Sequence, residues 1–475
     1  MKDTTDVRKT AELLVQTGQG HLLAFWEELD EAARRRLLSQ IEELDLQQVG
    51  RWVRQYVLSP TTVEAACSPE PAPFYPIQPL DESRRRKYRQ ASQLGQEVLR
   101  EGRIAAFVVA GGQGTRLGFD GPKGNFPITP VCGKTLFRVF AEYILAARTR
   151  FGAPCPWYIM TSPLNHAQTL EILESNAFYG LPRQDVVVFQ QGTMPNFGFD
   201  GRILMADKGR IATSPDGHGG SLRALHRSGA LADMKRRGIE HISYWQVDNP
   251  LINIFDPLFI GLHATDGAEM SSRAVIKNSP FEKVGNFCLV DGKMTVIEYS
   301  DLPDDLAEAR RPDGSLRFEL GSIAIHMIDR AFVERLNEHG FSLPLHRAVK
   351  KIPHIDAQGR LVEPTQPNGV KLESFIFDAL PLARKSIILE TLREAEFAPT
   401  KNATGVDSAE STRRMIVERA ADWLEAAGVK VPRKADGTPD CLLEIAPSFA
   451  LYKQDVRAKA AQVPPIRPGD SVYLS

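Results

Sequence analysis

The sequence predicts an α/β fold in which a mixed, mainly parallel sheet is flanked by helices, as in Rossmann-like domains. From Arg103 onward, short β-branched runs alternate with stretches of helical periodicity, which is typical of parallel sheets with helices on both faces. Several of the expected strands also end in glycines or acids. Because ligands on such sheets bind at the carboxyl ends of the strands, we expect a site at these ends.

The expected elements follow one another in a regular order. The run "RIAAFVVA" at 103–110 predicts a buried strand, and the helical pattern of 136–152 ends in a glycine. The alternation then predicts a strand, a helix, a strand, one long helix and a strand, at 156–162, 165–176, 185–192, 220–238 and 241–249. Further on, Asp291–Gly292 separates two apolar runs and is suited to a type I′ hairpin turn.

Three domains are expected along the chain of 475 residues. Apolar residues recur at helical spacing up to about residue 58, and the proline-rich stretch 59–79 should support no regular element. We assign residues 1–95 to an N-terminal helical domain with this connector. Residues 96–402 form the central α/β domain, and residues 403–475 form a small C-terminal domain with one long helix.

Composition limits the classes of partner and the compartment. The formal net charge is −1, so no global field attracts the chain to nucleic acid or to an anionic membrane. The five cysteines are scattered without a C-x-x-C pair, which fits a reducing compartment. The first residues lack the apolar core of a signal peptide, and no run of about eighteen apolar residues occurs. We therefore expect a cytoplasmic protein with no nucleic-acid or membrane partner.

Glycines gather directly after the first central strand, in "VVAGGQGTRLGFDG" at 108–121. A bare backbone lets a ligand approach closely and leaves amide N–H groups to bind it. Two familiar phosphate loops do not match: a dinucleotide fingerprint begun at Gly112 would need a glycine at Leu117, and a Walker A loop ending in Lys134 would need one at Ile128. The glycines alone are equally compatible with a tight turn.

Two cations and a carboxylate favour a ligand over a plain turn. Arg116 and Lys123 follow the loop closely enough to meet one phosphate chain, and Asp248 ends the strand of "YWQVDNPL" at the same sheet edge. A carboxylate there suits a hard divalent cation such as Mg²⁺, held together with phosphate oxygens. Each residue alone has a common alternative as a solvated cation or a turn cap. Their combination describes a nucleoside-triphosphate site.

The glycine loop and several later blocks resemble one enzyme family. "VVAGGQGTRLGFDGPKGNFPI" resembles the signature of the uridylyltransferases that make nucleotide sugars, above all the eukaryotic-type UDP-N-acetylglucosamine pyrophosphorylases. The blocks "FQQGTMPNFGFDGRI", "SPDGHGGSLRAL", "QVDNPL", "VIEYSDL", "QPNGVKLESFIFD" and "REAEFAPTKNATG" follow in the family's order. The resemblance runs from about residue 20 to about residue 450. It implies a nucleotidyltransferase-type central domain that makes UDP-sugar and pyrophosphate from UTP and a sugar 1-phosphate with Mg²⁺.

The resemblance also implies roles for residues of the matching blocks. It places the nucleotide against the glycine loop and two further positions, Gly111, Gly112, Gln113, Gly114, Thr115, Gln191 and Gly217. It implies that the catalytic phosphate-binding cations are Arg116, Lys123 and Lys401, and that Asp248 holds the metal beside the sugar. The remaining sugar contacts are expected from His218, Glu298, Ser322 and Phe375. The chemistry agrees, since an ionised sugar phosphate needs positioning and charge neutralisation rather than a general base.

Two positions depart from the family pattern and bear on the choice of sugar. The acetylhexosamine enzymes usually carry asparagine where this chain has His218 and Ser322. An amide donates and accepts at once, whereas serine offers a shorter hydroxyl and histidine a titratable ring. A histidine in a comparable glycine block occurs in UDP-glucose and broad-range UDP-sugar pyrophosphorylases, although His218 can equally be a structural residue of its own loop. N-acetylglucosamine 1-phosphate is the expected sugar, with glucose 1-phosphate or a mixed range as the alternative.

Two further hypotheses remain beside uridylyl transfer to a sugar phosphate. A guanylyl- or thymidylyltransferase would share the fold, but "FQQG" and the order of the blocks favour UTP. A catalytically silent nucleotide-sugar-binding regulator would be expected to lose one of the charged residues, and Arg116, Lys123, Asp248 and Lys401 are all present. We expect the protein to act as a monomer or a weak homo-oligomer.

Overall fold

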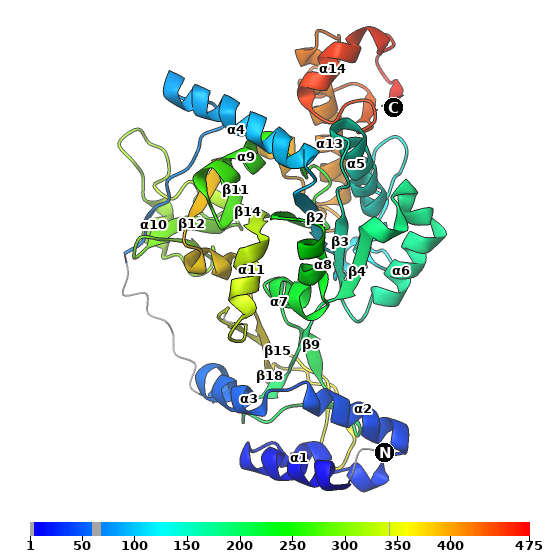
Figure 1. Cartoon of the computed structure of the whole chain (residues 1–475), viewed down its shortest axis with the longest axis vertical. Helices are drawn as coiled ribbons and strands as arrows, with labels where there is room; N and C mark the ends of the chain where they lie inside the picture. Colours follow the sequence, from blue (N-terminus) through cyan, green and yellow to red (C-terminus); the bar gives the residue numbers. More distant parts are fainter. Residues whose placement is uncertain (1–3, 59–67, 342) are drawn as a thin grey trace. The chain divides into compact units, whose positions relative to one another are not determined.

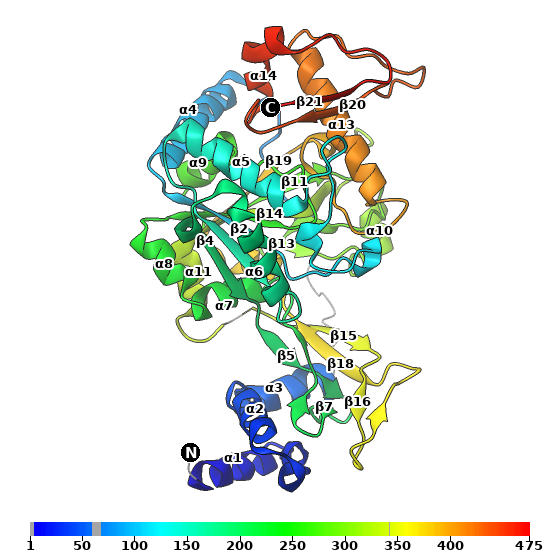
Figure 2. The same cartoon turned by 90° about the vertical axis from the view of Figure 1, so that its right-hand side faces the viewer.

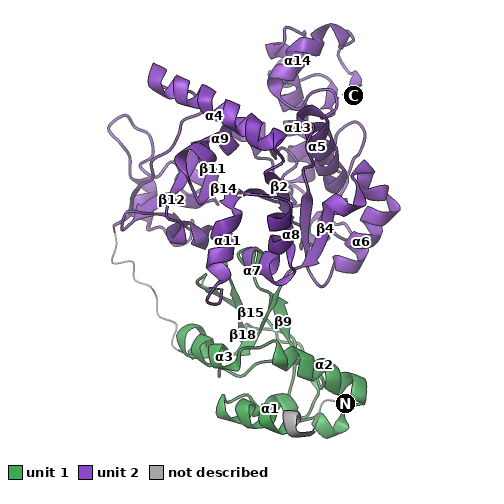
Figure 3. Cartoon of the chain, viewed as in Figure 1, with its two compact units in different colours: residues 1–66, 192–221, 343–376 green, residues 67–191, 222–342, 377–475 purple. Residues whose placement is uncertain are grey.

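The computed structural model describes residues 4–58, 68–341 and 343–475. The chain forms two compact units that interleave along the sequence (Figure 3). Unit 1 comprises Met1–Ala66, Gly192–Ser221 and Leu343–Ile376, and unit 2 comprises Cys67–Gln191, Leu222–Ser342 and Phe377–Ser475. These units differ from the three consecutive domains expected from the sequence, because two central segments of the chain fold with the N-terminal helices. Residues 403–475 belong to unit 2.

Unit 2 is built on a large mixed sheet, shown in Figures 1 and 2. Its strands lie in the order β1-β12-β14-β10-β2-β3-β4, with β11, β13 and β19 joined at the antiparallel half. The expected strands β2 (Ile104–Val109), β3 (Trp157–Thr161), β4 (Val186–Gln190) and β10 (His241–Gln246) are all present and mutually parallel. The predicted mixed α/β fold class is confirmed.

Both faces of the parallel strands are buried. On one face Ile104, Ala106 and Val108 join a core that includes helix α5 (Leu136–Phe151), where Phe140 packs edge-on against Trp245 with ring centroids 5.3 Å apart. On the other face Phe107 stacks on Phe189 and meets Tyr244 edge-on. Strands that are covered on both sides read as continuous apolar runs, which is why the sequence signalled them clearly.

The strand order contains a topological switch beside β2. The chain proceeds from β2 through α5 to β3, and then through α6 (His166–Ser175) to β4, moving outward in one direction. It returns through α8 (Ala230–Arg236) to β10, which pairs with the opposite edge of β2. Neighbouring connections that leave in opposite directions open a crevice at the carboxyl ends of the two strands. The glycine loop follows β2 at this crevice, and Asp248 follows β10.

Two expectations about local structure have different outcomes. The Asp291–Gly292 turn is confirmed: both residues have positive φ, 50° and 72°, and they join β12 (Gly285–Val290) to β13 (Lys293–Ile297). The single long helix expected at 220–238 is wrong. Two helices, α7 (Gly220–Arg227) and α8, replace it because Gly229 at φ 80° breaks the helical path between them.

The antiparallel half of the sheet and its helices complete the centre of unit 2. The strands are β11 (Met270–Ile276), β14 (Leu320–Asp329) and β19 (Ser386–Glu390), besides β12 and β13. The helices are α4 (Glu82–Arg100), α9 (Pro257–Asp266), α10 (Asp304–Glu308), α11 (Arg330–Asn337) and α12 (Arg393–Glu396). Helices α4 and α9 pack in direct backbone contact, since a Cβ at Gly261 would lie 1.6 Å from Ala91 O.

The C-terminal segment has a small core of its own within unit 2. It contains the expected helix α13 (Ala409–Ala426), α14 (Lys453–Lys459) and the parallel pair β20 (Leu442–Ile445) and β21 (Ser471–Leu474). Leu424, Leu443 and Val456 belong to this core, whereas Ile416 on α13 packs into the core of the main sheet. Helix α13 therefore ties the segment to the sheet.

Unit 1 joins the N-terminal helices to short strands from two later segments. The helices are α1 (Thr4–Gln16), α2 (Glu31–Glu42) and α3 (Leu46–Trp52), while residues 20–28 form 3₁₀ turns. The strands are β5 (Thr193–Pro195), β6 (Phe197–Gly198), β7 (Met205–Asp207), β8 (Arg210–Ile211), β9 (Thr213–Pro215), β15 (His346–Lys350), β16 (His354–Ile355), β17 (Leu361–Val362) and β18 (Gly369–Glu373). Leu37 and Val49 from the helices share one core with Phe197 and Val370 from the strands.

The proline-rich stretch, expected to be an ordered connector or a linker without regular elements, contains one short strand. Residues 59–67, with Cys67, lie outside the described residues, but β1 (Glu70–Pro71) pairs with β12 and Tyr75 bridges to Leu389. The four described cysteines are all free. Among the helices that the structure describes, none is long and apolar enough to cross a membrane.

Candidate active site

The glycine loop after β2 is held in place by a buried asparagine. Asn165 Nδ2 donates to Ala110 O at 2.9 Å and to Gly112 O at 3.2 Å, while its Oδ1 accepts from Ser162 N at 2.8 Å. The carbonyls of Ala110 and Gly112 therefore face Asn165. The sequence showed Asn165 only as the start of a helix, because a side chain that bonds to a distant loop leaves no periodic signal.

Gln191 lies directly against the first glycine of the loop. A Cβ added at Gly111 would lie 3.0 Å from Gln191 Oε1, so a larger residue there would push the amide side chain away by a few tenths of an ångström. Gln191 follows β4 and Gly111 follows β2, which places two predicted nucleotide-binding residues together at the sheet edge. The Gln113 Oε1 atom in the same loop is buried without a hydrogen-bond partner.

The rest of the loop is a compact turn. Gly114 N donates to Gly121 O at 2.9 Å, and a Cβ at Gly114 would lie 2.7 Å from the Phe119 ring. Thr115 begins a 3₁₀ turn that ends at Leu117, and Thr115 itself is exposed. Glycine is therefore required at position 114 for packing.

Lys123 extends back over the glycine loop. Its N–H donates to Gly112 O at 3.1 Å, and its Cε lies 3.9 Å from the position of a Cβ at Gly112. Burial lowers the pKa of Lys123, and the positive charges of Arg116 and Lys401 lower it further. Asp248 acts in the opposite direction on the same pKa. Because charges influence one another this way only at short range, the four groups lie together, and we call them the strand-end cluster.

Asp248 is a buried carboxylate two residues beyond the end of β10. It is 8% exposed, yet within the described ranges its carboxylate forms no salt bridge, and Lys123 forms none either. A second acid lies near, because Asp248 raises the pKa of Asp407, to which burial is the larger contribution. Buried charges are normally paired or bound to metal. Two neighbouring acids without such a pair fit a hard divalent cation.

The segment that carries Lys401 is bonded to the Asp248 loop. Thr400 N donates to Asp248 O at 2.8 Å, and Lys401 N donates to Asp407 O at 2.7 Å. Asp407 takes a left-handed conformation with φ 56° to close this turn. Sequence reasoning missed Asp407, since an acid in a loop after "PTKNATG" has no distinctive spacing. The residues predicted from separate blocks, Asp248 and Lys401, are thus joined through their main chains.

Two of the predicted sugar-binding residues meet at Gly285 of β12. A Cβ there would lie 3.4 Å from Glu298 Oε1 and 3.8 Å from Ser322 Cβ. Strand β14, which carries Ser322, is irregular beside this point. Ala324 has φ 55°, and the pairing of β11 with β14 shifts register between Ser272 and Ala274. Bulges of this kind redirect side chains and are frequent next to active sites.

The predicted residues Gly217, His218 and Phe375 lie in unit 1. Gly217 has φ 83°, and a Cβ there would lie 2.2 Å from Ser374 O, so the glycine block packs backbone to backbone. His218 Nδ1 accepts from Ile376 N at 3.0 Å, and its ring stacks on Phe375. Burial lowers the pKa of His218 to about 4. The ring is therefore neutral at pH 7 and braces its own loop.

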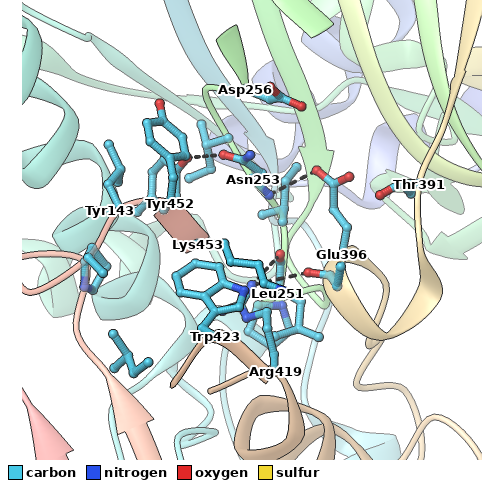
Figure 4. Close-up of a pocket in the computed structure, with 18 of the residues that line it drawn as sticks. Tyr143, Leu251, Asn253, Asp256, Thr391, Glu396, Arg419, Trp423, Tyr452 and Lys453 are labelled. Carbon is cyan, nitrogen blue, oxygen red and sulfur yellow. Dashed lines mark hydrogen bonds between the residues drawn. The ribbon is translucent and has the colours of Figure 1, made fainter. Parts of the chain in front are cut away.

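A separate cavity of about 620 Å³ lies beside the two chain segments that contain Leu251 and Glu396 (Figure 4). None of the strand-end cluster lines it. Arg419 of α13 donates from one nitrogen to Leu251 O at 2.8 Å and to Ala395 O at 3.5 Å. Burial lowers the pKa of Arg419 to about 10. This arginine joins the two segments by hydrogen bonds to their main chains, a role that the sequence did not reveal.

A glycine loop, neighbouring cations and a buried carboxylate beside the switch point of a parallel sheet are the features expected of a nucleotide-binding site of the nucleotidyltransferase class. The sequence model of the UTP--glucose-1-phosphate uridylyltransferase family matches residues 72–457. The chain belongs to this family and is a UTP:sugar-1-phosphate uridylyltransferase. Nucleotidyltransferases of this kind generally use a divalent metal ion.

Relatives and solved structures agree over nearly the whole chain. The chain is 35% identical to UDP-N-acetylhexosamine pyrophosphorylase-like protein 1 of Xenopus tropicalis, covering 95% of this chain and 93% of that one. It is 36% identical to the UDP-N-acetylglucosamine pyrophosphorylase of Saccharomyces cerevisiae, covering 89% and 92%. The UDP-N-acetylglucosamine pyrophosphorylase structure from Trypanosoma brucei superposes with a TM-score of 0.80 at 26% identity, covering 100% and 99%.

Proposed function

We propose that this enzyme transfers a uridylyl group from UTP to N-acetylglucosamine 1-phosphate, releasing pyrophosphate and using Mg²⁺. The relatives named above as UDP-N-acetylglucosamine pyrophosphorylases support this sugar. The single observation that carries the proposal is that Lys123 extends over Gly112 while the Lys401 segment bonds to Asp248 O through Thr400 N, beside the switch point at β2.

The proposed binding mode assigns each end of UTP to a different part of the sheet edge. The main chain of 111–115 and the amide of Gln191 bind the uracil and ribose, since Gly111 leaves room for that amide. Arg116, Lys123 and Lys401 bind the triphosphate. Arginine offers a planar fork to phosphate oxygens, while lysine provides a compact charge. Together they offset the repulsion between two anionic substrates.

The proposed reaction is an in-line displacement that requires no general base. A phosphate oxygen of the sugar 1-phosphate forms a bond to the α-phosphorus of UTP, and the bond from that phosphorus to the pyrophosphate oxygen breaks. The nucleophile is already ionised, so the residues act by orientation and charge stabilisation. Asp248, with Asp407 near it, would hold Mg²⁺, which supplies additional positive charge to the phosphates when bound.

The proposed sugar contacts are Glu298 and Ser322, which lie together at Gly285. A carboxylate accepts hydrogen bonds from sugar hydroxyls, and the Ser322 hydroxyl both donates and accepts. His218 accepts a hydrogen bond from Ile376 N, which argues against the direct sugar contact that the family resemblance implies. Contacts of Gly217, His218 and Phe375 with substrate remain predictions, as do a cytoplasmic location and a monomeric or weakly oligomeric state.

The test is pyrophosphate release with UTP, Mg²⁺ and a panel of sugar 1-phosphates. The panel comprises the 1-phosphates of N-acetylglucosamine, N-acetylgalactosamine, glucosamine, glucose and galactose. The proposal requires the highest kcat/KM with N-acetylglucosamine 1-phosphate. A preference for glucose 1-phosphate would show that the product is UDP-glucose. The reaction would still be uridylyl transfer. No release with any of these sugars would favour a nucleotide-sugar-binding regulator instead.

A further inference from the structure

Two histidines and an aspartate meet at the amino end of β10, opposite to the strand-end cluster. His241 is the first residue of β10, His263 lies in α9, and Asp329 ends β14. His241 Nδ1 lies 2.8 Å from Asp329 Oδ1, and His263 Nε2 lies 2.9 Å from the same oxygen. One donor atom from each residue falls within 4.8 Å of the other two.

The donor set has the composition and directions of a transition-metal site. Imidazole nitrogens and a carboxylate oxygen are ligands that Zn²⁺ takes in proteins, at about 2.0–2.2 Å. Three such ligands around a tetrahedral ion stand roughly 3.3 Å from one another. The nitrogen-to-oxygen distances of 2.8 and 2.9 Å would need to open by about half an ångström. The rings stand at 85° to each other with centroids 5.1 Å apart, so they approach the carboxylate from different directions.

The outer nitrogen of the His263 ring has a partner that suits a ligated imidazole. His263 Nδ1 lies 2.7 Å from Ser271 Oγ, which can accept a hydrogen bond from that nitrogen once Nε2 binds a metal. The outer nitrogen of His241, Nε2, lies 4.0 Å from Glu240 Oε2, which is a charge interaction rather than a hydrogen bond. Metal-bound histidines regularly donate their second N–H to a hydrogen-bond acceptor, which fixes the tautomer and the orientation of the ring.

The Asp329 side chain is directed to the histidines in preference to its local helix. Asp329 occupies the N-cap position of α11, where an aspartate normally accepts from the first turn, but it makes no such hydrogen bond. Its Oδ1 instead lies within hydrogen-bonding distance of both His241 and His263.

Solvent can reach the group of His241, His263 and Asp329 from one side. His263 is fully buried and the side chain of His241 is 9% exposed, while that of Asp329 is 30% exposed. An ion can therefore enter beside Asp329, where a water molecule would complete a four-coordinate shell. The β10 strand separates this point from the end that leads to Asp248 by roughly 17 Å. The two histidines and Asp329 therefore lie too far away to contact phosphates bound at the strand-end cluster.

We propose that His241, His263 and Asp329 form a binding site for one transition-metal dication of the Zn²⁺ type. The ion cross-links β10 and the helix that follows it, α9, to the more distant strand β14, all within unit 2. Its role is to stabilise the amino end of the sheet, and it takes no part in uridylyl transfer. This inference does not depend on which sugar the enzyme uses.

The experiment uses the full-length protein after removal of metals with a chelator. Equilibrium dialysis against Zn²⁺ should find one tight site per chain, and Co²⁺ should give the intense visible bands of tetrahedral nitrogen and oxygen ligation. Asp329→Asn and His241→Gln should each weaken binding at least tenfold, on the scale that metal-ligand environments show. Zn²⁺ should raise the unfolding temperature of the original protein and leave that of both variants unchanged.

Two controls make the result decisive. His226→Gln removes an exposed histidine that is not one of the three proposed ligands, so this variant should still bind the metal ion. Cys132 is an exposed free thiol, so thiolate-to-Co²⁺ charge-transfer bands that disappear in Cys132→Ser would identify a different site. Stoichiometric binding that persists in Asp329→Asn and His241→Gln would overturn the proposal, as would the absence of tight binding to the original protein. His263 is avoided as the primary variant because its full burial makes misfolding a competing explanation.

Discussion

Two groups of charged residues in unit 2 share two chain segments, one with Asp248 and Asp256 and the other with Glu396 and Lys401, but are organised differently. In the strand-end cluster, Asp248 and Lys123 influence each other without forming a salt bridge. Asp256, which follows Asp248 along the chain, bonds directly to buried Arg273, whose Nε lies 3.3 Å from Glu396 Oε2. We call Arg273, Asp256 and Glu396 the Arg273 network. The comparison separates charges that hold the fold from charges that are arranged for a ligand.

The largest expected effect is a loss of stability from the Arg273 network. Arg273→Met leaves Asp256 and Glu396 buried without their cation, which should lower the free energy of unfolding by about 3–5 kcal/mol. Urea denaturation followed by circular dichroism measures this change. Arg384→Met, which removes an exposed arginine with a side chain 78% accessible, should change stability by less than about 0.5 kcal/mol. Equal stability of the two variants would show that the Arg273 network does not stabilise the fold, and so would not differ in this respect from the strand-end cluster.

The next effect concerns activity and should leave the fold intact. Lys123→Ala removes one charge-stabilising group and should lower kcat/KM for UTP by about 100-fold, or roughly 2.7 kcal/mol. The urea midpoint should stay close to that of the original protein, because Lys123 forms no ion pair in the described ranges. Lys235→Ala, an exposed lysine of α8, is the matched charge control. Near-normal turnover in Lys123→Ala would exclude this lysine from the site.

Asp248→Asn tests the proposed metal contact. The amide keeps the shape of the side chain but removes its negative charge, so the divalent-ion concentration for half-maximal activity should rise by about tenfold or more. Titration of Mg²⁺ into steady-state assays at saturating UTP gives this value. Asp407→Asn should produce a smaller shift in the same direction. An unchanged Mg²⁺ requirement in Asp248→Asn would place the ion elsewhere.

Much of this site was predictable from the sequence, for a physical reason. Lys123 and Asp248 follow apolar strands buried on both faces, and such strands are the clearest signal in the chain. Asn165 and Arg419 were missed because each acts by hydrogen bonds to main-chain carbonyls of a distant segment. The division into units was also hidden, since segments such as 192–221 return to the N-terminal helices through short irregular strands. Contacts of that kind depend on three-dimensional packing rather than on periodicity.

The shifted pKa of Lys123 predicts an asymmetric pH profile. Burial and the neighbouring cations lower its pKa in the free enzyme, so the protonated lysine is lost at a lower pH than for an exposed lysine. The kcat/KM for UTP should fall as pH rises through this pKa. Bound phosphate restores the positive form, so the fall in kcat should occur at higher pH. Lys123→Arg should remove the alkaline fall in kcat/KM; persistence of that fall would assign it to another group.

The smallest effect concerns the sugar. Ser322→Asn introduces the amide usual in acetylhexosamine enzymes beside Glu298, and one added hydrogen bond is worth about 1 kcal/mol. The preference for N-acetylglucosamine 1-phosphate over glucose 1-phosphate should rise by about fivefold, measured as the ratio of the two kcat/KM values. An unchanged ratio would show that Ser322 does not contact the sugar. It would not contradict the proposed phosphate chemistry.

Direct binding of UTP tests the central claim that the strand-end cluster is arranged for a polyphosphate. Isothermal titration calorimetry would compare the original protein, Lys123→Ala and Lys235→Ala, with UTP and with uridine as ligands. We predict that Lys123→Ala weakens UTP binding by at least tenfold while leaving uridine binding and the Lys235→Ala control unchanged. Equal affinity of the original protein and Lys123→Ala for UTP would contradict the account.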